Sequence, residues 1–232
     1  MWFDFHNKVV YQHLFKTGGH SIYKNLVSYH QEDQDILNKW VNDKDHYKIP
    51  YNVLDYDVSN HHITFDEFSV IWPKIKWEEY WKFGFIRNTY DFLVASYKHQ
   101  MQISYFLHLP NNESKQLAAK ASTFEHYITN VWGYDNTQWD FITYKGKINL
   151  DFIGRFENLQ DDYNKVLDHI GLPRKPLEKI HSSKNREYVL TETADMANQH
   201  YSLWYTDKLL EFVKLKAKNE IEYFDFTFVD KR

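Results

Sequence analysis

The stretch "HLFKTGGHSIYKNL", residues 13–26, places a lysine, a threonine and two glycines between two apolar runs. Residues 8–15 are rich in Val, Tyr, Leu and Phe, which predicts a buried strand. After the glycines, Ile22, Leu26 and Tyr29 recur at helical spacing. A strand that passes through glycines into a helix leaves backbone N–H groups without intrahelical partners. Together with the helix dipole, these groups favour an anion such as phosphate or sulfate.

The side chains of this stretch strengthen the prediction of an anion site. Lys16 adds a positive charge, and Thr17 and Ser21 add hydroxyl donors. The spacing differs from the phosphate loop GxxxxGK[ST] of nucleotide triphosphatases, because here the lysine precedes Gly18 and Gly19 and none follows them. The alternative interpretation is a tight strand-to-helix turn with an incidental lysine, so a second site is needed to decide.

Length and composition limit the classes of protein that fit. The 232 residues suit one α/β domain, and an aromatic content of 19% supplies much of its core. The net charge of −4 gives no basic excess for general nucleic-acid binding. The absence of cysteine excludes disulfides, thiolate metal sites and cysteine nucleophiles. The sequence begins without the apolar run of a signal peptide and has no stretch of membrane-spanning length, so we expect a cytoplasmic protein without membrane partners.

Apolar spacing and turn residues predict alternating strands and helices along the chain. In the helix predicted over 64–72, Thr64 is the N-cap, because Thr64 and Glu67 form a capping-box pattern. Strands are predicted over 49–58, 81–88 and 148–159, and helices over 64–72, 90–107, 122–132, 160–170 and 205–224, the last with Thr206 as N-cap. This alternation predicts one α/β domain over residues 1–232, with a central parallel sheet flanked by helices. Ligands of such sheets bind beyond the carboxyl ends of the strands.

A second candidate site lies at the end of the 81–88 strand. In "FGFIRNTYDFLVASY" (83–97), Arg87 follows an apolar strand and precedes a helix. An arginine in that position can bind a phosphate through two parallel hydrogen bonds. The alternative interpretation is a pair between Arg87 and a surface carboxylate.

Four motifs in order resemble one family. "LFKTGGHSI", "FGFIRNTYDFLVASY", "DFIGRFENLQDDYNKVLDHIGLP" and "WYTDKLLEFVKLKAKNEIEYFDFTF" are similar to motifs of the sulfotransferases that act on carbohydrates and related acceptors. The resemblance runs from about residue 8 to residue 228 and implies a sulfotransferase fold like that of the P-loop nucleotide triphosphatases. It also implies 3′-phosphoadenosine 5′-phosphosulfate (PAPS) as the sulfuryl donor, without a metal.

The resemblance implies a role for each motif. The 5′-phosphosulfate would bind the loop made of Lys16, Thr17, Gly18, Gly19, His20 and Ser21. Lys16 would also neutralise the charge that develops as the sulfuryl group departs. Arg87 would bind the 3′-phosphate of the donor.

The chain departs from the family pattern RNPxxRLVSxY after Arg87. Thr89 replaces the proline, Phe92 replaces the second arginine, and the family serine falls on Ala95. Ser96 is the nearest hydroxyl, and we expect it to contact the 3′-phosphate, although one residue along a helix is a rotation of about 100°. His20 stands where a threonine is usual in the first loop.

Transfer to a hydroxyl needs a base for the acceptor proton. In "VSNHHITFDEF" (58–68), the resemblance to the histidine-bearing loop of the family implies His62 as that base and the adjacent His61 as a substrate contact. One alternative is that His61 is the base, and another is a pair of surface histidines that binds adventitious metal.

Other residues of the resemblance are candidates for the same pockets. Arg155 and Glu157 alternate at a predicted strand end and so face the same way, either as substrate contacts or as a structural ion pair. Lys184 and Arg186 lie in a polar loop where relatives complete the donor pocket, unless that loop is only solvated.

The sequence thus predicts a PAPS-dependent sulfotransferase that acts on a hydroxyl of a saccharide. The alternatives are a nucleotide-dependent phosphotransferase, which magnesium dependence would indicate, and a relative that binds a nucleotide or glycan without turnover.

Overall fold

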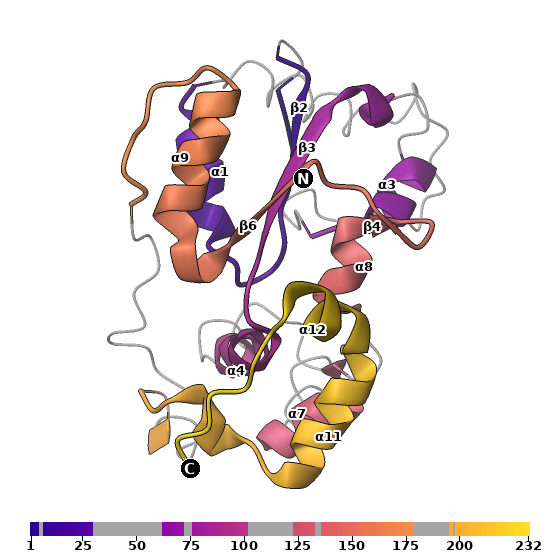
Figure 1. Ribbon diagram of the computed structural model, residues 1–232, viewed down its shortest axis with the longest axis vertical. Coiled ribbons are helices and arrows are strands. Elements are labelled where there is room, and N and C mark those ends of the chain that lie inside the picture. The colour runs from indigo at the N-terminus through magenta and orange to yellow at the C-terminus, as the bar shows by residue number, and fades with distance from the viewer. Residues whose placement is uncertain are drawn as a thin grey trace, which may run out of the picture. The chain divides into compact units, whose positions relative to one another are not determined.

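The computed structural model describes two compact units of the chain (Figure 1). The described residues are 1–4, 7–29, 62–71, 76–101, 123–132, 136–178, 195–196 and 198–232. The first unit comprises residues 1–86 and 140–180, and the second comprises residues 87–139 and 181–232. The expectation of a single domain over residues 1–232 stays a prediction.

The first unit contains a four-stranded sheet with helices around it. Its elements are β1 (Trp2–Asp4), β2 (Val9–Gln12), α1 (Gly19–Val27), α3 (Phe65–Ile71), η2 (Trp77–Glu79), β3 (Trp81–Ile86), β4 (Thr143–Tyr144), β5 (Lys147–Ile148), β6 (Phe152–Arg155), η4 (Phe156–Asn158) and α9 (Leu159–His169). The strand order is β1-β2-β3-β6, and β4 pairs with β5 in a separate hairpin. The predicted α/β class is confirmed.

Parallel pairing defines where the candidate site lies. β3 is parallel to β2, with Gln12 opposite Gly84, and parallel to β6, with Ile86 opposite Arg155. The carboxyl ends of these three strands therefore meet at one edge of the sheet. β1 pairs antiparallel with β2 at the other side of the sheet, and this edge strand was not predicted from the sequence.

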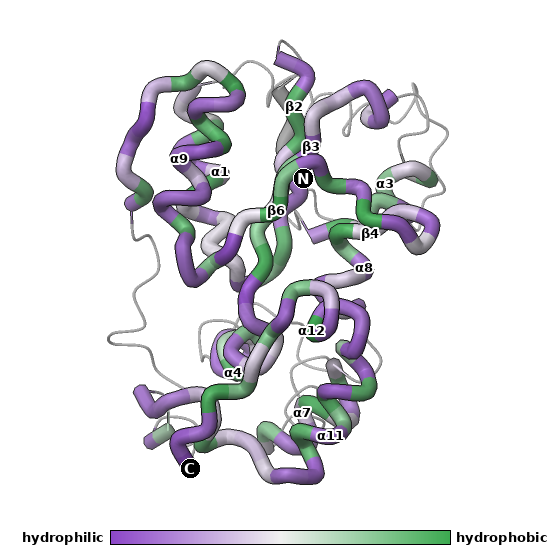
Figure 2. The backbone as a smooth tube through the Cα atoms, in the orientation of Figure 1, coloured by the Kyte–Doolittle hydropathy of each residue, from purple (hydrophilic) through white to green (hydrophobic). Residues whose placement is uncertain are grey.

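Helices α1 and α9 lie side by side against one face of the sheet (Figure 1). The core between them and the strands includes Tyr11, Phe83, Phe85 and Tyr163, none of which is exposed. Figure 2 shows mostly hydrophobic residues along the strands, whereas α9 alternates between hydrophobic and hydrophilic residues. That alternation is expected of a helix that buries one face only.

The predicted capping box before α3 is confirmed. The backbone N–H of Glu67 donates to Thr64 Oγ1 at 3.2 Å, and the backbone N–H of Thr64 donates to Glu67 Oε2 at 2.7 Å. These reciprocal bonds satisfy two donors that the first turn of a helix would otherwise leave open. They define where the segment after His62 turns into a helix.

The second unit is built from helices around an aromatic core. Its elements are α4 (Thr89–Gln100), α7 (Phe124–Asn130), η5 (Tyr201–Trp204), α11 (Asp207–Lys216) and α12 (Lys218–Phe224), and α8 (Gln138–Ile142) begins in this unit. Tyr97 packs against Phe124 and Trp204, with ring centroids 5.5 and 5.6 Å apart. The Tyr205 hydroxyl donates to the Tyr90 carbonyl at 2.9 Å, which ties η5 to the first turn of α4.

Several predicted boundaries differ from the structure. The terminal helix predicted over 205–224 begins after Thr206 as expected, but Ala217 divides it into α11 and α12. The predicted strand over 49–58 lies outside the described residues. Within the described part of the chain, no helix is long and apolar enough to cross a membrane.

Candidate active site

The loop between β2 and α1 has a left-handed backbone at two positions. Lys16 adopts a left-handed backbone with a φ of 57°, and Gly18 adopts one with a φ of 83° before α1 begins at Gly19. A residue with a side chain costs about 1–2 kcal/mol in that region. Strain of this kind is concentrated at functional sites, and here it turns the chain from the strand into the helix N-terminus.

Both glycines have a close neighbour, and Gly18 also has a positive φ that disfavours a side chain. A Cβ on Gly18 would lie 2.6 Å from Leu159 Cδ2, and a Cβ on Gly19 would lie 1.7 Å from His13 Nε2. The loop is therefore in direct contact with the start of α9 on one side and with the His13 ring on the other. Leu159 and His13 occupy the space that side chains at positions 18 and 19 would need, so the backbone at the start of α1 carries no side chains there.

The Thr17 hydroxyl forms a hydrogen bond within the loop. Its side chain is fully buried, and Oγ1 donates to the Leu14 carbonyl at 2.9 Å. A hydroxyl has one proton to donate, so this bond differs from the expectation that Thr17 Oγ1 donates to an anion. Binding of the donor by Thr17 stays a prediction, as does binding by the backbone amides of Gly18, Gly19 and His20.

His62 is held beside this loop by two hydrogen bonds that involve the end of β2. The side chain of Gln12 donates to the Ile63 carbonyl at 2.7 Å, and His62 Nδ1 lies 3.1 Å from the His13 carbonyl oxygen. A carbonyl can only accept, so Nδ1 carries the proton in this bond and Nε2 of the neutral ring is the basic nitrogen. His62 therefore has the tautomer that a general base with Nε2 as proton acceptor requires.

The His13 ring connects the loop and His62. Its centroid lies 4.4 Å from that of His62 and 5.7 Å from that of His20. The ring is buried and stacks on Tyr11 at a centroid distance of 5.6 Å. Among the described residues, no group of three or more His, Asp or Glu side chains has the arrangement to hold a metal ion.

The prediction that Arg155 and Glu157 face the same way because they alternate along a strand is wrong. β6 ends at Arg155, and Glu157 lies in the 3-10 turn η4, so strand alternation does not set the directions of both side chains. The backbone N–H of Arg155 donates to Asp162 Oδ2 at 2.8 Å. The 3-10 turn η4 connects the end of β6 to the start of α9 at Leu159. Substrate contact by Arg155 and Glu157 stays a prediction.

In the second unit, Arg87 precedes α4 and is paired with a carboxylate in the first turn of that helix. Nε of Arg87 donates to Asp91 Oδ2 at 2.8 Å, and one terminal nitrogen lies 2.7 Å from the same oxygen. Asn88 caps α4, because its side chain accepts from the Tyr90 N–H at 3.1 Å. The Arg87 side chain is mostly buried, with 15% of it exposed.

The departures from the family pattern have distinct structural outcomes. Thr89 Oγ1 donates to the buried Glu220 carboxylate at 2.5 Å. Phe92 is buried in the helix core, and Ala95 is half-buried. Ser96 is 2% exposed, and its hydroxyl has no hydrogen-bond partner among the described residues. A contact between Ser96 and the 3′-phosphate stays a prediction.

Several residues that contact the predicted site residues within one or the other unit were not predicted from the sequence. They are His13, Asp91, Gln138 and Glu220. Asp91 had a sequence signal, since it lies four residues after Arg87 on a predicted helix. The other three meet their partners through tertiary contacts. The predicted residues His61, Lys184 and Arg186 lie outside the described part of the chain.

Comparison with known proteins decides the family. The sequence model of the sulfotransferase family matches residues 1–227. The chain belongs to the sulfotransferase family. It is 25% identical to human carbohydrate sulfotransferase 9 over 197 residues, which are 71% of this chain and 44% of that protein. An uncharacterized protein of Archaeoglobus fulgidus is 32% identical over 69 residues, which are 28% of this chain and 58% of that protein.

The chain thus spans less than two thirds of the length of either relative. No solved structure matches it significantly. The sulfotransferase fold predicted from the four motifs agrees with the family match and with the α/β sheet of the first unit.

Proposed function

We propose that this sulfotransferase-family chain transfers a sulfuryl group from PAPS to a hydroxyl of a saccharide. The observation that carries the proposal is the Nδ1–H bond of His62 to the His13 carbonyl, three residues before Lys16. In the neutral ring this bond leaves Nε2 as the basic nitrogen, and His13 lies at the end of β2 next to the loop that we propose binds the anion. The name of the human relative supports a carbohydrate as the acceptor.

In the proposed reaction, the acceptor oxygen attacks the sulfur of the donor. A new S–O bond forms, the bond from sulfur to the bridging phosphate oxygen breaks, and 3′-phosphoadenosine 5′-phosphate leaves. The acceptor proton passes to Nε2 of His62. Negative charge develops on the bridging oxygen, where the Lys16 ammonium and the amides of Gly18 and Gly19 stabilise it.

We assign the remaining donor contacts by the same proposal. His20 and Ser21 lie in the first turn of α1, which favours an anion. The Ser21 N–H donates to the Gly18 carbonyl at 3.1 Å, so Ser21 contributes its hydroxyl and His20 its backbone N–H. Arg87 binds the 3′-phosphate through its guanidinium. Because Asp91 occupies Nε and one terminal nitrogen, the phosphate must share the guanidinium with this carboxylate or displace it.

The donor site is tested by calorimetric titration with 3′-phosphoadenosine 5′-phosphate and with ADP, each with and without magnesium. We expect preferential, metal-independent binding of the first nucleotide and its loss in Lys16→Ala and Arg87→Ala. Equal affinity for ADP, or a requirement for magnesium, would contradict the proposal and favour a phosphotransferase.

The base is tested separately by assaying sulfuryl transfer to a panel of saccharides. We expect His62→Ala to lose transfer by 10²-fold or more while its affinity for 3′-phosphoadenosine 5′-phosphate is unchanged. His126→Ala is the matched control, because His126 is exposed on α7. Donor binding without transfer to any saccharide in the unaltered chain would indicate a non-catalytic relative.

A further inference from the structure

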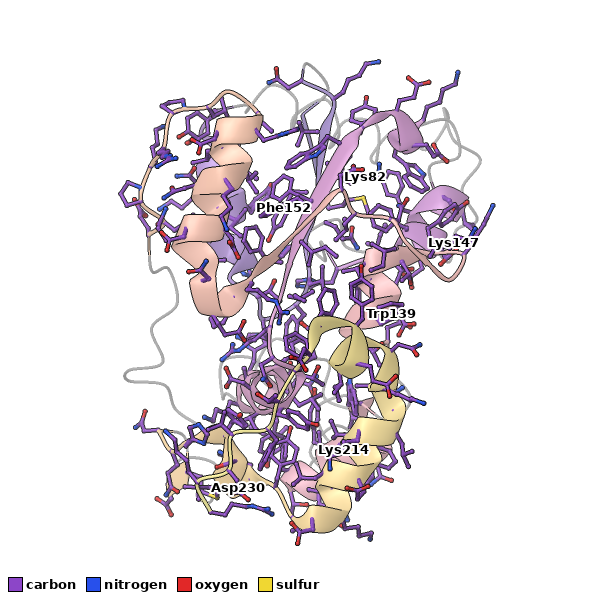
Figure 3. All side chains as sticks on the ribbon, viewed as in Figure 1. Lys82, Trp139, Lys147, Phe152, Lys214 and Asp230 are labelled. Atoms are coloured by element: carbon purple, nitrogen blue, oxygen red, sulfur yellow. The ribbon has the colours of Figure 1, made fainter. Side chains whose placement is uncertain are left out.

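The second unit contains a buried carboxylate that the proposed chemistry does not use. Glu220 on α12 is 1% exposed. Its Oε1 accepts from Thr89 Oγ1 at 2.5 Å and from Gln138 Nε2 at 3.4 Å, and its Oε2 accepts from the Trp139 N–H at 2.9 Å. A buried carboxylate is costly unless such donors surround it. Figure 3 labels the Trp139 side chain at the start of α8.

Gln138 connects this carboxylate to the proposed phosphate ligand. Its Oε1 accepts from the Arg87 backbone N–H at 2.9 Å, and its Nε2 donates to the Arg87 carbonyl at 2.8 Å. One amide side chain therefore pairs with both backbone groups of Arg87, as a neighbouring strand would. Gln138 is itself 2% exposed, so water does not compete for these bonds.

Glu220 in turn restricts Gln138 in two ways. It accepts from the Gln138 side chain, and it accepts from the backbone N–H of the next residue, Trp139. The first interaction favours the amide orientation in which Nε2 faces Arg87 O and Oε1 faces Arg87 N. The second holds the start of α8, from which the Gln138 side chain extends.

Thr89 stands where the family pattern has a proline, and it takes part in this network. A proline at the first position of a helix fixes φ but has no donor. Thr89 occupies that position of α4, is fully buried and donates to Glu220. The segment Arg87–Thr89 is therefore held by hydrogen bonds from both its backbone and its side chains.

We propose that Gln138 and Glu220 are positioning residues that hold Arg87 in the orientation that binds a phosphate monoester. This inference rests on the proposed function, in which Arg87 binds the 3′-phosphate of the donor. Gln138 determines the direction of the Arg87 backbone, and Asp91 holds the guanidinium. Neither Gln138 nor Glu220 touches the reacting groups.

The test measures how strongly the protein prefers a nucleotide with a 3′-phosphate over one without it. Dissociation constants for 3′-phosphoadenosine 5′-phosphate and for adenosine 5′-phosphate are measured by calorimetry, and their ratio reports the 3′-phosphate contact. We expect Gln138→Met, which keeps the side-chain length but loses both bonds to Arg87, to reduce this ratio at least tenfold. Glu220→Leu is expected to reduce it severalfold, and neither variant should change the affinity for adenosine 5′-phosphate by more than twofold.

Two controls separate positioning from general loss of structure. Thr206→Ala weakens the cap of α11 in the same unit without touching Arg87, so its ratio should equal that of the unaltered chain. Combining Gln138→Met with Arg87→Ala should reduce the ratio no further than Arg87→Ala alone. If Glu220→Leu does not fold, Thr89→Val removes one donor to the same carboxylate and should produce a smaller reduction.

The outcomes distinguish this inference from the proposed function. If Arg87→Ala abolishes the preference but Gln138→Met retains it within twofold, the positioning role is wrong and the proposed donor site stands. If the unaltered chain shows no preference for the nucleotide with the 3′-phosphate, both are overturned.

Discussion

Gly19→Ala tests whether the His13 ring fixes the loop that carries Lys16. The added Cβ would lie 1.7 Å from His13 Nε2 and 1.8 Å from Cδ2, about half of an ordinary carbon contact. The ring is 3% exposed and packs against Tyr11 and His62, so it has little room to move. The substitution therefore overpacks a buried site.

Two opposing effects determine how much Gly19→Ala changes the free energy of unfolding. Overpacking a core costs about 1–3 kcal/mol, and overlap with two ring atoms favours the upper end of that range. Alanine is better than glycine within a helix by about 0.5–1 kcal/mol, which offsets part of this cost at the first residue of α1. We expect Gly19→Ala to lower the free energy of unfolding by about 2 kcal/mol.

The assay is urea denaturation of a double-mutant cycle with His13→Ala. Removing the imidazole creates the space that the new methyl group needs, so Gly19→Ala should cost nothing in that background. Gly146→Ala is the control, because Gly146 has a φ of 76° and no atom within 4 Å of its added Cβ. It should cost about 1 kcal/mol from backbone strain in either background. Equal costs of Gly19→Ala with and without His13 would show that the His13 ring does not constrain Gly19.

Two further predictions concern stability. Thr206→Ala removes the side chain that accepts from the Leu209 N–H at 3.3 Å, and should cost about 1 kcal/mol in urea denaturation. Burial alone would raise the pKa of Asp162, but hydrogen bonds from Lys165 and from the Arg155 N–H outweigh it and lower that pKa below its ordinary value. The stability due to Asp162 is therefore present above its ordinary pKa and lost as pH falls through the folded value. Asp162→Asn should cost about 1–2 kcal/mol at pH 6 and progressively less below about pH 4, and a pH-independent difference would contradict this.

Local sequence signals predicted the elements that carry the site. The capping box at Thr64 and Glu67 defined the start of α3, and Thr206 defined the start of α11. The apolar run that ends in Arg87 defined the carboxyl end of β3. These features depend on residues within four positions of each other, so sequence spacing suffices to find them.

Contacts between distant residues could not be predicted in the same way. Thr89 and Glu220 are 131 positions apart, and a glutamate in an amphipathic helix is ordinarily assigned to solvent. His13 has no motif that distinguishes it from the other twelve histidines, and its role depends on the close approach of Gly19. The 3-10 turn at Glu157 arises from the geometry of entry into α9, which alternation does not encode.

The departures from the family pattern after Arg87 are connected physically. A proline would preset the first turn of α4 without help from other segments, whereas Thr89 depends on Glu220 for its buried hydroxyl. Helix α12 has only seven residues and is too short to be stable alone, so packing and hydrogen bonds within the second unit must maintain it. The orientation of Arg87 therefore depends on a segment more than 130 residues later in the chain. Substitutions in α12 that loosen Glu220 should weaken binding of the 3′-phosphate before they affect the loop at Lys16.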